Sequence, residues 1–159
     1  MAPKTLLVIG HVPSANTRAL RDAVVEGARA DGIDDVDVRA LSPFDAGSAD
    51  VLAADAVILG TTENLGYMSG ALKDFFDRTY YGVLEEKQGM PYALYVRAGL
   101  DGTGTMRAVG SITTGLTRDF PEPRQCRGVR DLCASSLPNL KIPGQAREAA
   151  WLAGRCLSF

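Results

Sequence analysis

The sequence predicts a three-layer α/β fold in which helices cover both faces of a parallel sheet. Residues 6–9, 56–60 and 92–96 are short continuous apolar runs, the pattern of strands buried on both faces. Segments with helical periodicity follow these runs, so strands and helices alternate along most of the chain. Because parallel crossovers are right-handed, few topologies remain, and the strand order 2-1-3-4-5 fits best.

The first 54 residues predict a strand, a helix, a second strand and a short helix or turn. The first strand ends at Gly10, and Asp31-Gly32 ends the helix that follows it. Residues 36–39 alternate apolar and charged side chains, so this strand belongs at a sheet edge. Residues 42–54 allow only a short helix or turn. The apolar residues of the first helix are Leu20, Ala23, Val24, Gly27 and Ala28.

A third strand over residues 56–60 leads through a polar loop into an amphipathic helix that starts near Ser69. A fourth strand over 92–96 is followed by a helix that extends to Leu116. The topology requires a fifth strand, but residues 119–145 contain four of the eight prolines and no β-branched run. We therefore expect this segment to be irregular, with a closing helix after it. The whole chain, 1–159, is predicted to be one domain.

Composition excludes several classes of protein. An apolar content of 46% suffices for a core without disulfides or a metal. The chain has no run of about 18 apolar residues and no signal-peptide pattern, so we expect a cytoplasmic protein without membrane insertion. Three cysteines, Cys126, Cys133 and Cys156, are odd in number and predict reduced thiols, and their spacing, far from His11, predicts no metal site.

The formal net charge of −2 does not predict nucleic-acid binding. Residues 1–80 carry 7 basic and 12 acidic side chains, and residues 81–159 carry 10 and 7. Four arginines contribute to the basic second half, and a solvated surface is favoured for them over contact with an acidic partner or a phosphate. They are Arg118, Arg124, Arg127 and Arg130.

Three loops, over residues 10–17, 60–67 and 98–104, follow the buried strands and should meet at one edge of the sheet. The first loop offers Ser14, Asn16 and Thr17 together with free backbone N–H groups at a helix start. Such a helix start can bind a phosphate, but Ser14 or Asn16 can equally serve as a helix cap. The residues alone leave both interpretations open.

Other phosphate-binding and catalytic patterns are missing. The chain contains neither G-x-x-x-x-G-K-[ST] nor, after Gly10, G-x-G-x-x-G, and it has no G-x-S-x-G. A receiver domain would place acidic residues after its first and third strands, where this chain has His11 and Thr61. A P-loop nucleotidase, a dinucleotide-binding domain and a typical hydrolase are therefore disfavoured.

The three loops together resemble the flavodoxin-like superfamily, and within it the NAD(P)H-dependent FMN reductase and quinone reductase branch. The resemblance spans about residues 4–118. Its most specific part is Gly60-Thr-Thr-Glu-Asn-Leu-Gly-Tyr-Met-Ser-Gly-Ala-Leu-Lys-Asp-Phe-Phe-Asp77. Departures are Thr62, where many relatives carry proline, and the tail after Leu116.

The resemblance implies that FMN binds noncovalently at the strand ends. Ser14, Asn16 and Thr17 would hold its phosphate, with Arg18 as an outer charge. The backbone of Gly99, Asp101 and Gly102 would face the pyrimidine edge of the flavin. The ring and ribityl chain would be lined by Thr61, Thr62, Glu63, Asn64, Leu65 and Gly66.

On this resemblance the chain is an oxidoreductase that passes electrons from NADPH or NADH through FMN to a quinone or another small acceptor. No side chain is expected to be catalytic, because the chemistry takes place on FMN. Two other interpretations stay open: an electron-carrier flavodoxin, and a flavodoxin-like binding protein that has lost FMN. We also expect a homo-oligomer, a dimer or tetramer, with Tyr80-Tyr81 as a candidate for the interface.

Overall fold

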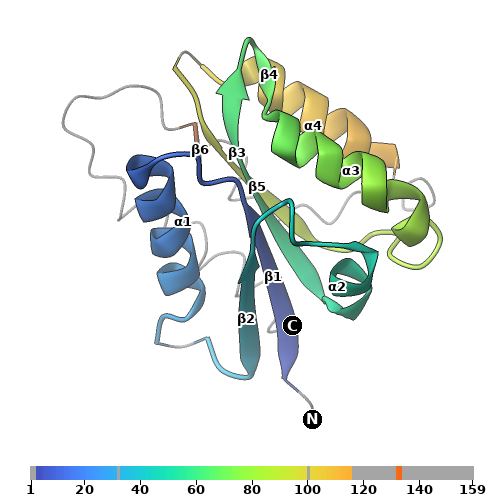
Figure 1. The fold of residues 1–159 in the computed structure, drawn as a ribbon. Coiled ribbons are helices and arrows are strands. Elements are labelled where there is room, and N and C mark those ends of the chain that lie inside the picture. Colours follow the sequence, from blue (N-terminus) through green and yellow to red (C-terminus); the bar gives the residue numbers. More distant parts are fainter. Residues whose placement is uncertain (1–2, 32, 100, 116–131, 134–159) are drawn as a thin grey trace.

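The computed structural model describes residues 3–31, 33–99, 101–115 and 132–133 (Figure 1). Strands and helices alternate along these residues, as the apolar pattern predicts. No helix among them is long and apolar enough to cross a membrane. The elements are β1 (Lys4–Gly10), α1 (Ala15–Ala28), β2 (Val36–Leu41), α2 (Ser48–Ala53), β3 (Ala56–Asn64), β4 (Tyr67–Met68), α3 (Gly70–Val83), β5 (Tyr92–Arg97), α4 (Thr103–Gly115) and β6 (Leu132–Cys133).

Five strands form a parallel sheet in the order β2-β1-β3-β5-β6. Counted as parallel strands along the chain this is 2-1-3-4-5, so the predicted order is confirmed. The half-exposed strand β2 lies at the edge, as its alternating pattern indicates. The fifth strand, β6, lies beside β5 where the topology requires it, and it pairs with Tyr95 and Val96.

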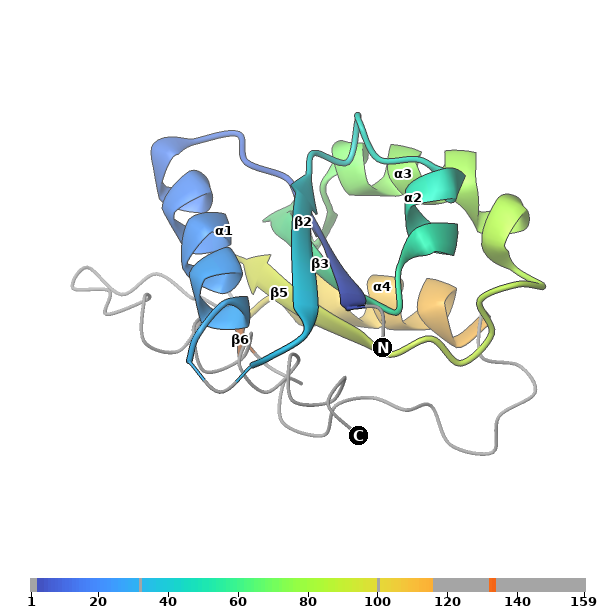
Figure 2. The ribbon, with the colours of Figure 1, turned by 90° about the horizontal axis from the view of Figure 1, so that it is seen from below.

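Helix α1 covers one face of the sheet, and α2, α3 and α4 cover the other (Figure 2). Successive residues of a strand point to opposite faces. Leu6 and Val8 of β1 therefore pack in the cluster under α1, whereas Leu7 and Ile9 pack in the cluster with α3. Burial of both faces explains why the central strands are continuous apolar runs.

The predicted loop over residues 60–67 is wrong in one respect, because most of it belongs to the sheet. Strand β3 continues through Asn64 and pairs with β5 as far as Thr62. It then folds back as an antiparallel hairpin with β4, in which Asn64 faces Tyr67. The residues after Gly60 are polar, so no apolar run indicates this extension of the strand. A hairpin that projects from the sheet edge therefore replaces the expected loop (Figure 1).

Several predictions fall outside the described residues. They are the irregular conformation of residues 119–145 apart from β6, the closing helix, Cys126, Cys156, and the arginines Arg118, Arg124, Arg127 and Arg130. The extent of the single domain likewise stays a prediction.

Candidate functional site at the carboxyl edge of the sheet

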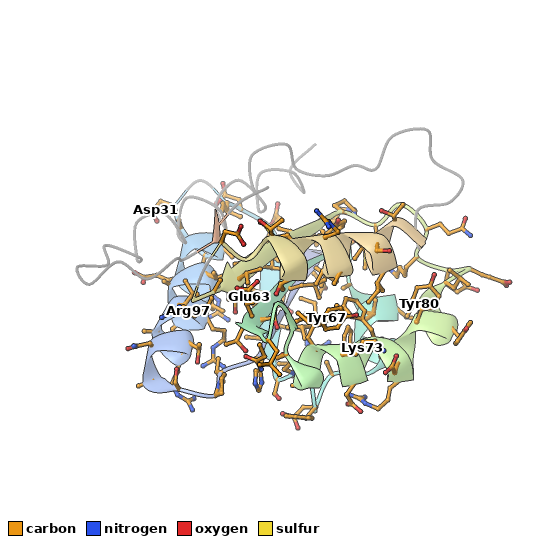
Figure 3. The ribbon with its side chains drawn as sticks, turned by 90° about the horizontal axis from the view of Figure 1, so that it is seen from above. Asp31, Glu63, Tyr67, Lys73, Tyr80 and Arg97 are labelled. Carbon is orange, nitrogen blue, oxygen red and sulfur yellow. The ribbon has the colours of Figure 1, made fainter. Side chains whose placement is uncertain are left out.

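Three connections meet at the carboxyl edge of the sheet, as predicted. They follow β1, β3 and β5, which run parallel as neighbours. The backbone N–H of His11, just after β1, donates to the carbonyl oxygen of Gly60 in β3 at 3.0 Å. Figure 3 looks down on this edge, with Glu63 and Tyr67 of the hairpin between Arg97 on the side of α1 and Lys73 on α3.

The first connection ends in a capping box at the start of α1. The hydroxyl of Ser14 accepts a hydrogen bond from the backbone N–H of Thr17 at 3.3 Å, and the hydroxyl of Thr17 accepts one from the backbone N–H of Ser14 at 3.0 Å. The capping interpretation is thus confirmed for this pair. The first turn of α1 carries no acidic side chain, and Asn16 and Arg18 are exposed. The helix start is therefore electrostatically suited to an anion, and phosphate binding stays a prediction.

The second connection is the β3–β4 hairpin. Its two turn residues, Leu65 and Gly66, have φ angles of 54° and 76°. Positive φ at both central residues of a two-residue hairpin is the pattern of a type I′ turn. Leu65 is fully exposed at 106%, and Tyr67 is 43% exposed. The hairpin thus presents Glu63, Asn64, Leu65 and Gly66 at the edge of the sheet, the segment predicted to line a flavin.

The two threonines before the turn have different surroundings. Thr61 is 2% exposed, and its hydroxyl donates to Ser69 Oγ at 2.9 Å and accepts from the Ser69 N–H at 3.1 Å. Ser69 in turn caps α3 by accepting from the Leu72 N–H at 3.2 Å. The Thr61 side chain therefore holds β3 against α3. The Thr62 hydroxyl is buried and has no hydrogen-bond partner among the described residues.

The third connection leads into α4. The Asp101 carboxylate accepts from the backbone N–H of Thr103 at 3.0 Å, and this bond lowers the pKa of Asp101. Gly102 adopts a φ of 70° just before the helix, and Gly99 is exposed. A Cβ atom on Gly104 would overlap the carbonyl oxygen of Gly66. The hairpin tip therefore lies directly on the first turn of α4.

Tyr95 lies beneath this edge, a position that its place in an apolar strand does not predict. Its ring crosses the sheet on the side of α1, and a Cβ atom on Gly60 would overlap it. A Cβ atom on Gly10 would lie 2.7 Å from Tyr95 Oη. The strand register places Gly10, Gly60 and Tyr95 on three neighbouring strands. Two glycines beside an aromatic residue on neighbouring strands indicate this close contact, but they can be recognised only when the strand register is known.

His11 shapes the edge beside α1 and β2. Its ring meets the exposed ring of Phe44 edge-on, with 6.3 Å between the ring centroids. Burial lowers the pKa of His11, which favours the neutral ring near pH 7. Among the described residues no group of three or more His, Cys, Asp or Glu side chains could hold a metal ion.

The donor set of the edge fits a phosphorylated polar ligand such as FMN. The start of α1 offers backbone N–H groups and no competing acid. The Thr62 and Thr105 hydroxyls, one at the end of β3 and one in the first turn of α4, are buried without a hydrogen-bond partner among the described residues. Buried hydroxyls of this kind are rare unless a ligand or a water satisfies them.

An apolar pocket among the described residues lies away from this edge. It opens on the other face of the sheet, among α2, α3, α4 and the loop before β5. Val57 and Tyr92, which line it, stand near the amino ends of β3 and β5. Its walls are almost entirely apolar, which suits neither a phosphate nor a ribityl chain. We therefore assign the candidate site to the carboxyl edge and not to this pocket.

Known FMN reductases and flavodoxins are similar in sequence to this chain. Residues 41–116 match the family of NADPH-dependent FMN reductases. A flavodoxin from Aquifex aeolicus is 32% identical over 111 residues, which are 70% of this chain and 59% of that protein. The chain thus spans about 59% of the length of this curated relative.

Solved structures share the fold. A flavodoxin from the domain Archaea superposes with a TM-score of 0.75 at 17% identity, covering 98% of this chain and 99% of that one. A WrbA-like flavodoxin from Agrobacterium tumefaciens superposes with a TM-score of 0.71 at 19% identity, covering 98% of each chain. The chain has the flavodoxin-like fold. The match over residues 41–116 is to the FMN reductase branch of proteins with this fold.

Proposed function

We propose that this protein is an FMN-dependent oxidoreductase that takes electrons from NADPH and passes them to a quinone or another small acceptor. The observation that carries the proposal is the FMN reductase match over residues 41–116. That segment contains the hairpin, α3 and α4, which frame the carboxyl edge. FMN would supply the redox chemistry, and the protein would supply binding, orientation and electrostatics.

The residues of the edge have separate proposed roles. Ser14, Asn16 and Thr17, with the backbone N–H groups at the start of α1, would hold the phosphate. Thr62 and the hairpin would line the ring and the ribityl chain. Thr61, whose hydroxyl is bonded to Ser69, would act through its backbone and by holding β3 in place.

The third connection would tune the cofactor. Backbone N–H groups of Gly99, Asp101 and Gly102 would face the pyrimidine edge of the flavin. Negative charge develops at this edge on reduction, so oriented N–H dipoles favour the reduced form. The Asp101 side chain is already bonded to the Thr103 N–H, which helps to fix the start of α4.

An electron-carrier flavodoxin is the second candidate, and the 32% identity to the Aquifex aeolicus flavodoxin favours it. Such a carrier moves single electrons between protein partners and needs no nicotinamide site. Strongly acidic surfaces usually steer such carriers to their partners, and the net charge of −2 is weak for that purpose.

A visible absorption spectrum tests both candidates. Purified protein mixed with FMN and freed of excess flavin by gel filtration should stay yellow. Under anaerobic conditions NADPH alone should bleach it, and a quinone should restore the colour. Retained colour without bleaching would favour the carrier, and loss of the colour in gel filtration would contradict both. A parallel titration with NADH tests the donor.

Three further predictions accompany the proposal. We expect a homo-oligomer, a cytoplasmic location and no nucleic-acid partner. Sedimentation velocity tests the first. Tyr80 and Tyr81 meet edge-on, with ring centroids 5.4 Å apart, and Tyr81 is 85% exposed, which keeps this pair a candidate for the interface.

A further inference from the structure

Leu65 occupies a backbone position that disfavours leucine. Its φ of 54° lies in the left-handed region, and this conformation lowers stability when an L-residue has a bulky side chain. Type I′ turns prefer asparagine, aspartate or glycine at this position, and Asn64 stands one residue too early to fill it. Local sequence preference and the observed fold therefore conflict at Leu65.

Packing within the chain does not compensate for this conflict. The Leu65 side chain is fully exposed, and neither buried cluster of the described residues includes it. The turn is also held in place, because the Gly66 carbonyl lies where a Cβ atom of Gly104 would be. Asp35, the other described non-glycine residue with positive φ, is of a type that tolerates this conformation. The backbone conformation of Leu65 thus lowers stability, and no packing contact of its side chain among the described residues offsets this loss.

Backbone strain that persists with no packing gain points to function. Leu65 stands at the tip of the hairpin that frames the candidate site, two residues before the half-exposed Tyr67. We propose that the Leu65 side chain contacts the electron acceptor and selects apolar planar acceptors over small ionic ones. This inference rests on the proposed function and adds to it the residue that determines acceptor choice.

A small acceptor fits these two side chains better than a protein surface does. Of the five exposed large apolar side chains described, only Leu65 and Tyr67 belong to the hairpin. A stable protein interface buries about 800 Å² on each partner, far more than two side chains provide. One leucine and one aromatic ring are instead comparable in size with a bicyclic quinone.

Two variants of Leu65 test the inference. Leu65→Asn fits the turn and removes the apolar side chain, so we expect its Tm to rise by about 2–4 °C. With FMN bound and NADPH saturating, its KM for menadione should rise about fivefold to tenfold. The ratio of its KM for menadione to its KM for ferricyanide should also rise, because only the apolar acceptor loses a contact. Leu65→Met keeps an apolar side chain of similar volume and should keep the original KM for menadione.

Two control variants distinguish relief of backbone strain from loss of the contact with the acceptor. Asp35→Gly relieves the other positive φ, at the far end of the sheet, and Tyr81→Asn removes an apolar side chain that is 85% exposed on α3. Neither should change the KM for menadione. An unchanged Tm in Leu65→Asn would overturn the premise, and an unchanged KM would overturn the conclusion. A change from dimer to monomer with an unchanged KM would also overturn it, in favour of a contact between copies.

The proposed function can fail separately. If the unaltered protein does not bind FMN, or if NADPH does not reduce it, the oxidoreductase proposal fails before acceptors are compared. If reduction is normal and only the effect of Leu65→Asn is missing, the inference about Leu65 fails alone.

Discussion

Replacing Tyr95 with phenylalanine should stabilise the protein. Tyr95 is 4% exposed, and its Oη atom has no hydrogen-bond partner among the described residues. A buried hydroxyl without a partner costs about 1–3 kcal/mol, because it loses its bond to water and gains none. Tyr95→Phe removes this cost and leaves only a hydroxyl-sized gap over Gly10, which offsets part of the gain. We expect a net gain of about 1 kcal/mol, or about 2–4 °C in Tm for a chain of this length.

Urea unfolding of the FMN-free protein measures this gain through the linear extrapolation of the free energy of unfolding. Tyr81→Phe is the matched control, because its side chain is 85% exposed and its hydroxyl stays hydrated in either state. The control should change the free energy of unfolding by less than about 0.5 kcal/mol. A loss of about 1 kcal/mol or more in Tyr95→Phe would refute the reasoning and would mean that the hydroxyl has a partner, such as a buried water.

The same residue predicts an effect of alkaline pH. Burial raises the pKa of Tyr95 above its usual value of about 10. The folded protein therefore retains a proton that the unfolded chain releases, so this part of the stability is present below pH about 10 and is lost as pH rises further. The stability advantage of Tyr95→Phe should widen above pH 10. Parallel curves of Tm against pH for the two proteins would contradict the burial of a neutral phenol.

Three other perturbations test the edge. Ser14→Ala should cost about 1 kcal/mol of stability through loss of the cap, and a fluorescence titration should show weaker binding of FMN but not of riboflavin, since only FMN has the phosphate. If Ser14→Ala weakened the binding of FMN and riboflavin equally, the assignment of Ser14 to the phosphate would be contradicted. Gly104→Ala should destabilise by about 1–3 kcal/mol in urea unfolding, because its Cβ atom meets the backbone of Gly66, and an unchanged midpoint would mean that the hairpin moves freely. Burial lowers the pKa of His11, so the contribution of His11 to the free energy of unfolding is present above pH about 6.5 and is lost as pH falls below it. The single histidine should show this lowered pKa in a proton NMR titration, and an ordinary pKa would contradict its burial.

The sheet could be predicted from sequence because both of its faces are buried. Leu6, Leu7, Val8 and Ile9 are all fully buried, so burial leaves a continuous apolar run that identifies a central strand. The edge strand β2 has one exposed face, and its alternation placed it correctly. The extension of β3 left no such signal, because Thr62, Glu63 and Asn64 carry polar side chains.

The site was predictable in outline and not in its contacts. Parallel strands place their following loops at one edge, so the convergence of the connections follows from topology. The roles of individual hydroxyls depend on distances that the sequence does not contain. Thr61 and Thr62 are adjacent and identical in type, yet one is bonded to Ser69 and the other has no partner among the described residues. The reach of Tyr95 across two glycines likewise depends on strand register.

Mapping of FMN binding by amide chemical shifts tests the central claim most directly. Titration of the isotope-labelled protein with FMN should shift the amide signals of residues 10–17, 61–66 and 99–102, the three connections at the carboxyl edge. Signals of Val57, Val83 and Tyr92, around the apolar pocket, should not move. Shifts confined to that pocket, or no shifts at all at saturating FMN, would contradict the assignment of the site to this edge.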